Sequence, residues 1–413
     1  MVPDPGLNEP AGSPESAASD PGAQPDVPGQ ADVPGQPQVS GQPYAPGQPY
    51  APGQAFGQAY VPGPPVAPGA YPPVAYAPVP FPPTYQVGPP PQPSALPIVP
   101  REYHEFFRAP RFRWWKPLAA IGMFLGSWLV LNVVLSIPLG VYYAATGQLG
   151  TITGSQIKVT PVLFALNNVL LALCVPLAGL TTWAVFRQRP RWISSIAGGF
   201  RWRLFGRFTL VAFVVLAIST GAQILLSGGI EGLAWNQDSV FLIATILVTT
   251  PFQSAGEEYM LRGLGARAIG SWFSWRRAGL TVATAVTSVI FMLLHGAGDP
   301  WLNAFYLLFA VLSSVLVWRT GGLEASVALH MCNNLISEAT LPFSSIEGIF
   351  DRHAGVAGPE TLWQMATIVL VAGLLLWQAR RLKLSRTAAP AAPNPSEPSA
   401  PGGVFWNSSH TIA

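Results

Sequence analysis

Long, nearly uninterrupted apolar runs alternate with short polar segments over most of the chain after residue 100. A helix needs about 20 mostly apolar residues to cross a bilayer. Eight runs meet this requirement, and we expect each to form one membrane-spanning helix. They cover residues 117–143, 161–186, 205–227, 239–262, 279–297, 301–318, 323–343 and 362–379. The pattern therefore predicts an all-α, polytopic membrane protein.

The composition agrees with this fold class. The chain has 413 residues, of which 50% are hydrophobic and only 10% are charged, whereas soluble domains carry about 25% charged residues. The mean hydropathy is +0.35. These values exclude a soluble globular enzyme. Only two cysteines are present, Cys174 and Cys332, and both lie in apolar runs, which excludes a disulfide framework and a cysteine-based zinc site.

The first 100 residues lack such apolar runs and contain 29 of the 44 prolines. An irregular unit recurs there, as in Asp26-Val-Pro-Gly-Gln30 and Pro49-Tyr-Ala-Pro-Gly-Gln54. Because this composition cannot bury a core, we expect a disordered Pro/Gly/Gln/Tyr-rich tail over residues 1–100. A second disordered tail is expected over residues 390–413, which leaves residues 101–389 as the membrane domain. The repeated tyrosines suggest a protein partner for the first tail.

All 22 lysines and arginines lie after residue 100, and they gather in alternate loops. The loop after the fourth span, for example, contributes Arg262, Arg267, Arg276 and Arg277, whereas the opposite set of loops holds only Lys158 and Arg352. Because basic loops stay in the cytoplasm, both termini are expected there. The basic residues flank spans and form no single patch, so we expect no nucleic-acid partner.

Few ionisable residues lie inside the expected spans, where they are energetically costly and mark function. They are Glu257, Glu258, His295 and His330, with Glu324 and Glu338 nearer to span ends. Glu258 and Arg262 are four residues apart, as are His330 and Asn334, so each pair shares a helix face. Glu257 is turned about 100° away from Glu258 and can point into a cavity.

These side chains suit amide hydrolysis. Glu257 can take a proton from water, and a histidine can orient that water or protonate a leaving amine. A histidine and an asparagine can donate hydrogen bonds to an oxyanion. A divalent metal is the alternative, because Glu257, His295 and His330 also form a donor set for Zn²⁺ with water in the fourth position. The H-E-x-x-H signature is absent, so the sequence leaves the two mechanisms open.

Three short motifs, in order, resemble those of the CPBP intramembrane proteases, also called the Abi or CAAX-protease family. E-E-x-x-x-R runs from Glu257 to Arg262, F-x-x-x-H from Phe291 to His295, and H-x-x-x-N from His330 to Asn334. Each motif is weak alone, but the three together, each on an expected span, are a strong signal. The motif region covers residues 239–342.

The resemblance implies an intramembrane endopeptidase with an all-helical membrane domain. By resemblance, Glu257 would activate the water, His295 would assist, and His330 with Asn334 would stabilise the oxyanion. Glu258 and Arg262 would support the site. The implied partners are membrane lipid and a peptide or protein substrate, and the implied location is an integral position in a bacterial plasma membrane. The family is described both as metalloproteases and as metal-free glutamate enzymes, and we favour the metal-free mechanism.

Two other functions remain as alternatives. In the first, the chain is a non-catalytic scaffold that recruits partners through its cytoplasmic tail. In the second, which ranks lower because no inverted repeat is visible, Glu257 and His330 form the proton relay of a transporter.

The expected span boundaries leave one geometric difficulty. At 1.5 Å per residue, Glu257 lies about 9 Å from the end of its span, whereas His295 lies about 24 Å from the start of the next. The two side chains cannot meet unless the fourth span continues past Arg262 or residues 263–278 dip into the membrane.

Overall fold

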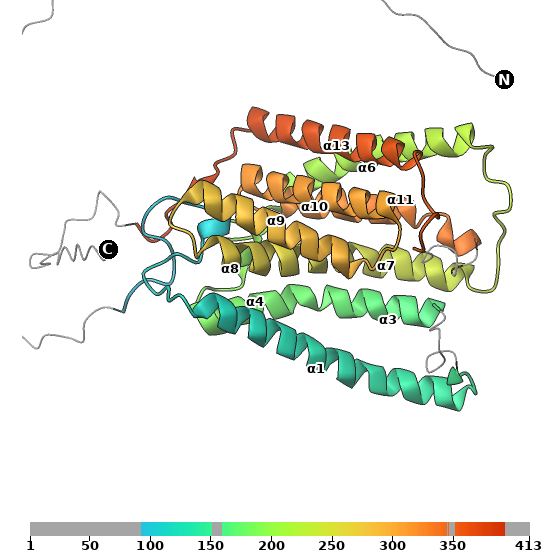
Figure 1. Ribbon diagram of the computed structural model, residues 1–413, viewed down its shortest axis with the longest axis horizontal. Coiled ribbons are helices and arrows are strands. Elements are labelled where there is room, and N and C mark those ends of the chain that lie inside the picture. Colours follow the sequence, from blue (N-terminus) through green and yellow to red (C-terminus); the bar gives the residue numbers. More distant parts are fainter. Residues whose placement is uncertain (1–91, 151–158, 345, 347–351, 393–413) are drawn as a thin grey trace, which may run out of the picture. The chain divides into compact units, whose positions relative to one another are not determined.

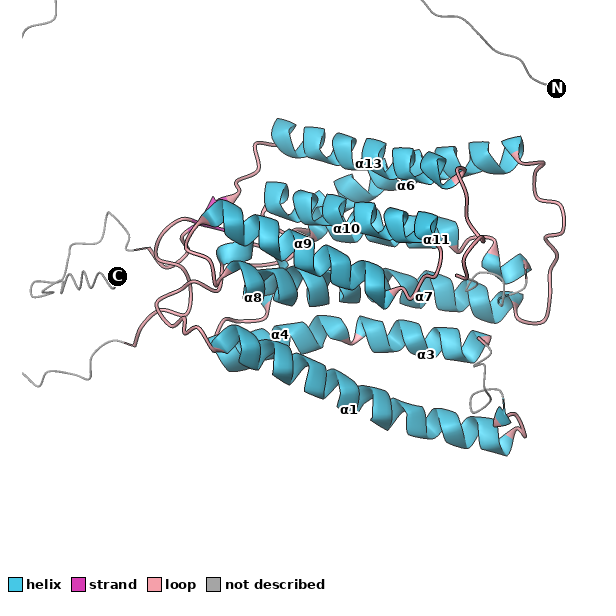
Figure 2. Cartoon of the chain, viewed as in Figure 1, coloured by secondary structure: helices cyan, strands magenta, loops and turns pink. Residues whose placement is uncertain are grey.

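The computed structural model describes residues 92–150, 159–344, 346 and 352–392 of the chain (Figure 1). Most of the tail expected over residues 1–100, and nearly all of that expected over residues 390–413, therefore lies outside the described residues. Helices dominate the described part, and its paired strands are a single two-residue ladder (Figure 2). The expectation of an all-α membrane protein is confirmed.

Seven helical segments of the described chain are long and apolar enough to cross a membrane. They are α1 (Lys116–Ala145), α3 with α4 (Pro161–Ala172 and Cys174–Phe186), α6 (Trp202–Leu226), α7 with its continuation to Gly270 (Ser239–Glu258 and beyond), α9 (Arg276–Leu294), α10 (Pro300–Thr320) and α13 (Thr361–Arg381). Shorter elements are η1 (Tyr103–Glu105), α5 (Arg191–Ser194) and η3 (Leu341–Phe343). The break between α3 and α4 lies at Leu173, three residues before Pro176, whose missing N–H cannot continue the helix.

The seventh predicted span, residues 323–343, is only partly helical. It forms α11 (Glu324–Ser337), whose 14 residues are about 21 Å long. This helix lies between α6, α7 and α10, and most of its first half is buried. Because protein surrounds it, its length need not match the bilayer thickness. Glu324 begins the helix and is held by Arg201, with Nη2–Oε2 at 2.6 Å.

The fourth span is longer than expected. Beyond Glu258 it continues as a π-helix, η2 (Tyr259–Gly265), and then as α8 (Ala266–Gly270). This continuation resolves the geometric difficulty, and only residues 271–275 separate it from α9. Arg262 and Arg267, which the sequence pattern assigns to a basic loop, are instead buried in this helix. Arg276 and Arg277 alone remain at the surface there.

The segments before α1 and after α13 meet at the same end of the bundle (Figure 1). Strand β1 (Arg101–Glu102) pairs antiparallel with β2 (Thr387–Ala388), with Arg101 opposite Ala388. Seven long segments together with α11 make eight passes along the bundle, which brings the two segments to one side.

Candidate active site

The three motifs lie on three helices that meet inside the bundle. Glu257 and Glu258 end α7, Phe291 lies in the last turn of α9, and His330 lies in α11. Helices α7 and α11 are neighbours. The Phe291 ring lies 5.7 Å from the His330 ring and 4.5 Å from the His295 ring, centroid to centroid. Phe291 therefore contacts both imidazoles.

A buried ionic network holds one side of the site. Arg262 donates from Nη1 to Glu258 Oε1 at 3.1 Å and from Nη2 to the Ala310 carbonyl at 3.0 Å. His330 Nδ1 lies 3.0 Å from the same Glu258 oxygen. All three side chains are buried. Loss of one partner of such a buried pair costs about 3–5 kcal/mol, because the remaining charge has no compensation.

Glu257 faces a different environment from its neighbour. Its Oε2 lies 3.7 Å from His330 Nε2, and its side chain is 12% exposed, whereas that of Glu258 is 0% exposed. Gln253, one turn earlier on α7, donates from Nε2 to Glu257 Oε1 at 2.5 Å. His330 thus stands between the two glutamates, with one ring nitrogen toward each.

Asn334 is one turn beyond His330 on α11, and its amide is directed at α7. Its Nδ2 donates to Gln253 Oε1 at 3.2 Å and to Ser254 Oγ at 3.3 Å. A chain of hydrogen bonds consequently runs from Asn334 through Gln253 to Glu257.

His295 caps the C-terminal end of α9 and is partly exposed. Its Nδ1 lies 2.8 Å from the Phe291 carbonyl oxygen. Because a carbonyl only accepts, Nδ1 carries the proton, and a neutral ring leaves Nε2 with a free lone pair. The ring stacks on Tyr306 at 4.0 Å between centroids, which fixes its orientation.

The site includes two residues that were not predicted from the sequence, Gln253 and Tyr306. Gln253 lies four residues before Glu257 on the same helix. This spacing places both side chains on one helix face, so it could have predicted their contact. Tyr306 lies on α10, and no pattern in the sequence relates it to His295.

The residue types of Glu257, His295 and His330 suit a metal, but among the described residues their ligand atoms do not all lie within 4.8 Å of one another. With Nδ1 of His295 and of His330 directed at hydrogen-bond partners, each ring can present Nε2, and Glu257 adds a carboxylate. Two imidazoles and a carboxylate are the protein ligands of many catalytic zinc sites, and ligating histidines donate their other nitrogen to a carboxylate or carbonyl. The metal role of these residues stays a prediction.

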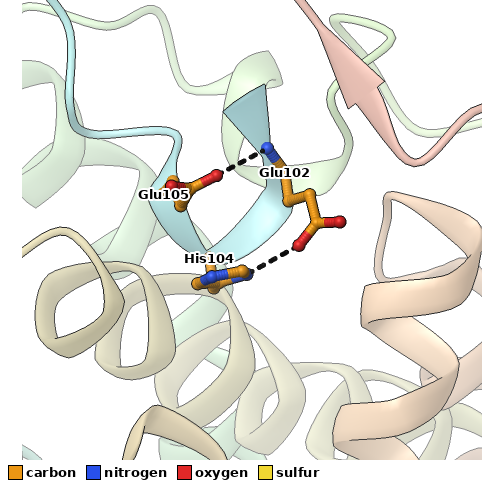
Figure 3. Close-up of side chains that lie close together, drawn as sticks. All are labelled: Glu102, His104 and Glu105. Atoms are coloured by element: carbon orange, nitrogen blue, oxygen red, sulfur yellow. Dashed lines mark hydrogen bonds and ion pairs between the residues drawn. The ribbon is translucent and has the colours of Figure 1, made fainter. Parts of the chain in front are cut away.

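A second cluster of possible ligands lies in the segment before α1. Ligand atoms of Glu102, His104 and Glu105 lie within 4.8 Å of one another (Figure 3). Both carboxylates already have protein partners: Arg276 Nε lies 2.9 Å from Glu105, and Trp318 Nε1 lies 3.1 Å from Glu102. We interpret this cluster as a structural contact that holds the η1 segment against α9 and α10, and we call it the η1 tie.

His104 lies within this cluster, and its Nδ1 is 3.8 Å from Glu102 Oε2. Its Nε2 donates to the Arg276 carbonyl at 3.1 Å, and the side chain is 4% exposed. Burial lowers the pKa of His104 below its usual value of 6.5, against the opposing effect of Glu105 and Glu102.

Comparison with known proteins gives two matches. Residues 238–336 match the family model described as type II CAAX prenyl endopeptidase Rce1-like. The uncharacterized protein YyaK of Bacillus subtilis (strain 168) is 26% identical over 155 residues, which cover 35% of this chain and 50% of that protein. The chain thus spans about half the length of this curated relative. No solved structure matches the chain.

The matched segment contains α7, α9 and all of α11 except its last residue, and with them every residue of the three motifs. The resemblance suggested by the motifs is therefore confirmed: over residues 238–336 the chain is similar to the Rce1-like type II CAAX prenyl endopeptidases.

Proposed function

We propose that the protein is an intramembrane endopeptidase that hydrolyses a peptide bond with a water activated by Glu257. The family match over residues 238–336 supports CAAX-type intramembrane proteolysis in general. The observation that carries the specific proposal is the meeting of Glu257 with His330 at 3.7 Å, beside a buried Glu258–Arg262 pair. This separation exceeds a direct hydrogen bond and suits one water shared between the two side chains.

In this mechanism Glu257 takes a proton as the water oxygen attacks the carbonyl carbon. The carbon–nitrogen bond then breaks, and the proton passes to the leaving amine. His295 assists, because its Nε2 lone pair can accept and return a proton. Glu258 and Arg262 hold His330 and keep the site rigid.

His330 and Asn334 stabilise the oxyanion in this mechanism. When protonated, His330 Nε2 donates a hydrogen bond on the Glu257 side while Nδ1 stays on Glu258. Asn334 contributes when its amide exchanges the 3.3 Å bond to Ser254 for one to the oxyanion.

A metal bound by Glu257, His295 and His330 would polarise the carbonyl and lower the pKa of bound water. Metal content of the purified protein, measured by elemental mass spectrometry, decides this alternative independently of activity. A stoichiometric metal that is lost in His295→Ala overturns the metal-free mechanism.

The central test compares peptide termini in membrane proteomes from cells that carry the wild type or Glu257→Gln. We expect a set of termini to vanish in Glu257→Gln and in His295→Ala. Glu360→Gln is the control, because Glu360 is an exposed carboxylate outside the motifs. Identical termini in the wild type and in a Glu257→Gln protein inserted at normal levels would refute the proposal.

A further inference from the structure

A pocket outside the candidate active site lies where α1 begins and α4 ends. Its volume is about 610 Å³, which is within the usual range of ligand pockets. Helices α1 and α4 pack against each other at this end (Figure 1). The charged residues that line the pocket are all basic: Arg111, Arg113, Lys116 and Arg187.

None of these four residues forms an ion pair with a carboxylate of the described chain. Arg111 and Arg113 donate only to backbone carbonyls, those of Pro93 and Phe112. The Arg187 guanidinium lies 5.9 Å from the Trp183 ring, and Arg187 ends α4 with a φ of 60°. This left-handed conformation is common at the residue that ends a helix. Four like charges around one pocket repel one another unless an anion lies between them.

The remaining lining of the pocket is largely apolar. Ala119, Ala184 and Val185 line it together with Trp115. Apolar surface continues from the pocket along both helices, because Leu118 is 52% exposed and Trp183 is 50% exposed. Tryptophan is typical of the level of lipid headgroups. A cationic site that adjoins exposed apolar helix surface matches a molecule with an anionic head and a hydrocarbon tail.

We propose that this pocket binds the phosphate headgroup of an anionic membrane phospholipid. The acyl chains lie on the exposed apolar faces of α1 and α4. Basic pockets between membrane helices bind such headgroups elsewhere. The site is separate from the peptidase motifs, so its test does not depend on the proposed activity.

The test is native mass spectrometry of the full-length protein in mixed micelles of phosphatidylglycerol and phosphatidylcholine. We expect the wild type to retain phosphatidylglycerol selectively. Arg113→Gln/Arg187→Gln should bind it about 30-fold more weakly, because each interfacial basic residue strengthens such binding about fivefold. The matched control, Arg203→Gln/Arg207→Gln, removes the same charge from exposed positions near the start of α6 and should retain the lipid. Arg113→Lys/Arg187→Lys, which keeps the charge, should also retain it.

Three results would overturn the proposal. The first is equal loss of phosphatidylglycerol in both Gln double variants, which indicates general surface charge. The second is no loss in either variant. The third is full displacement of the lipid by inorganic phosphate or by an acidic peptide, which indicates a site for a soluble anion or for a protein segment.

Discussion

At the scale of single residues, the candidate site depends on two adjacent glutamates with different surroundings. Glu258 is fully buried and neutralised by Arg262, whereas Glu257 is partly exposed and is held through Gln253. One residue of helix rotation, about 100°, accounts for this difference. The buried carboxylate is suited to positioning His330, and the exposed one to chemistry.

Gln253 is expected to be a positioning residue. In Gln253→Ala, Glu257 loses the donor that fixes its carboxylate, and kcat on an identified substrate should fall about 10- to 100-fold with little change in KM. Gln223→Ala, a change of the same residue type in α6, is the control. A changed KM with normal kcat would assign Gln253 to substrate binding instead.

The sequence predicts part of this residue pattern. The pairing of Glu258 with Arg262 follows from four-residue spacing on one helix, and the structure confirms it. The bond between Glu258 and His330 joins residues 72 positions apart, and only tertiary packing produces it. Gln253 and Asn334 are bonded across helices in the same way.

At the scale of elements, α7 carries the site because it packs closely on α3. Gly256 makes this contact possible, since a Cβ there would overlap the carbonyl oxygen of Leu171. Directly after this contact come Glu257 and Glu258, so helix packing fixes the position of both carboxylates.

Gly256→Ala should therefore impair both stability and activity. The added methyl group forces α3 and α7 apart, at a cost of about 1–3 kcal/mol in the free energy of unfolding. Thermal unfolding in detergent and substrate cleavage are the measurements. Gly206→Ala is the control, because a Cβ at that position in α6 meets nothing within 4 Å. Equal stability of the two variants would contradict the packing argument.

The η1 tie predicts a pH dependence of stability. Because burial lowers the pKa of His104 in the folded state, the unfolded state binds more protons as the pH falls below about 6.5. The contribution of His104 is therefore complete above that pH and decreases as the pH falls. Between pH about 8 and about 5, thermal stability should decline more steeply in the wild type than in His104→Gln. His353→Gln, at an exposed position, should follow the wild type.

Element boundaries were the least predictable feature. The π-helix η2 and the continuation into α8 contain Arg262 and Arg267, two charges that a hydropathy pattern assigns to a loop. Arg267 is instead buried against aromatic rings, with its guanidinium 3.8 Å from the centroid of Tyr103. Stacking on aromatic faces offsets part of the cost of burying a guanidinium, and no periodicity in the sequence signals it.

At the scale of the whole molecule, the alternation of basic loops predicts that both ends of the membrane domain are cytoplasmic. The pairing of β1 with β2 supports the prediction that both ends lie on the same side of the membrane. It does not show which side that is. Residues after α13 and the connection between α6 and α7 should then be on opposite sides of the membrane.

Thiol labelling tests this sidedness. The native thiols Cys174 and Cys332 are buried and give little background. In intact cells an impermeant maleimide should label Glu231→Cys but not Ser385→Cys, both at exposed positions. Permeabilised cells should show both labels. The reverse pattern in intact cells would invert the predicted orientation.

The pairing of the two ends has a consequence for protein engineering. The Ala391 N–H donates to the Pro97 carbonyl at 3.1 Å, so a short linker between these positions would make the described chain nearly circular. Such a permutant can be opened elsewhere with little loss of buried contact. An opening at Ser274, an exposed residue between α8 and α9, would keep the new ends on the original side of the membrane. An opening within residues 227–238 would transfer both ends to the opposite side and leave every helix intact.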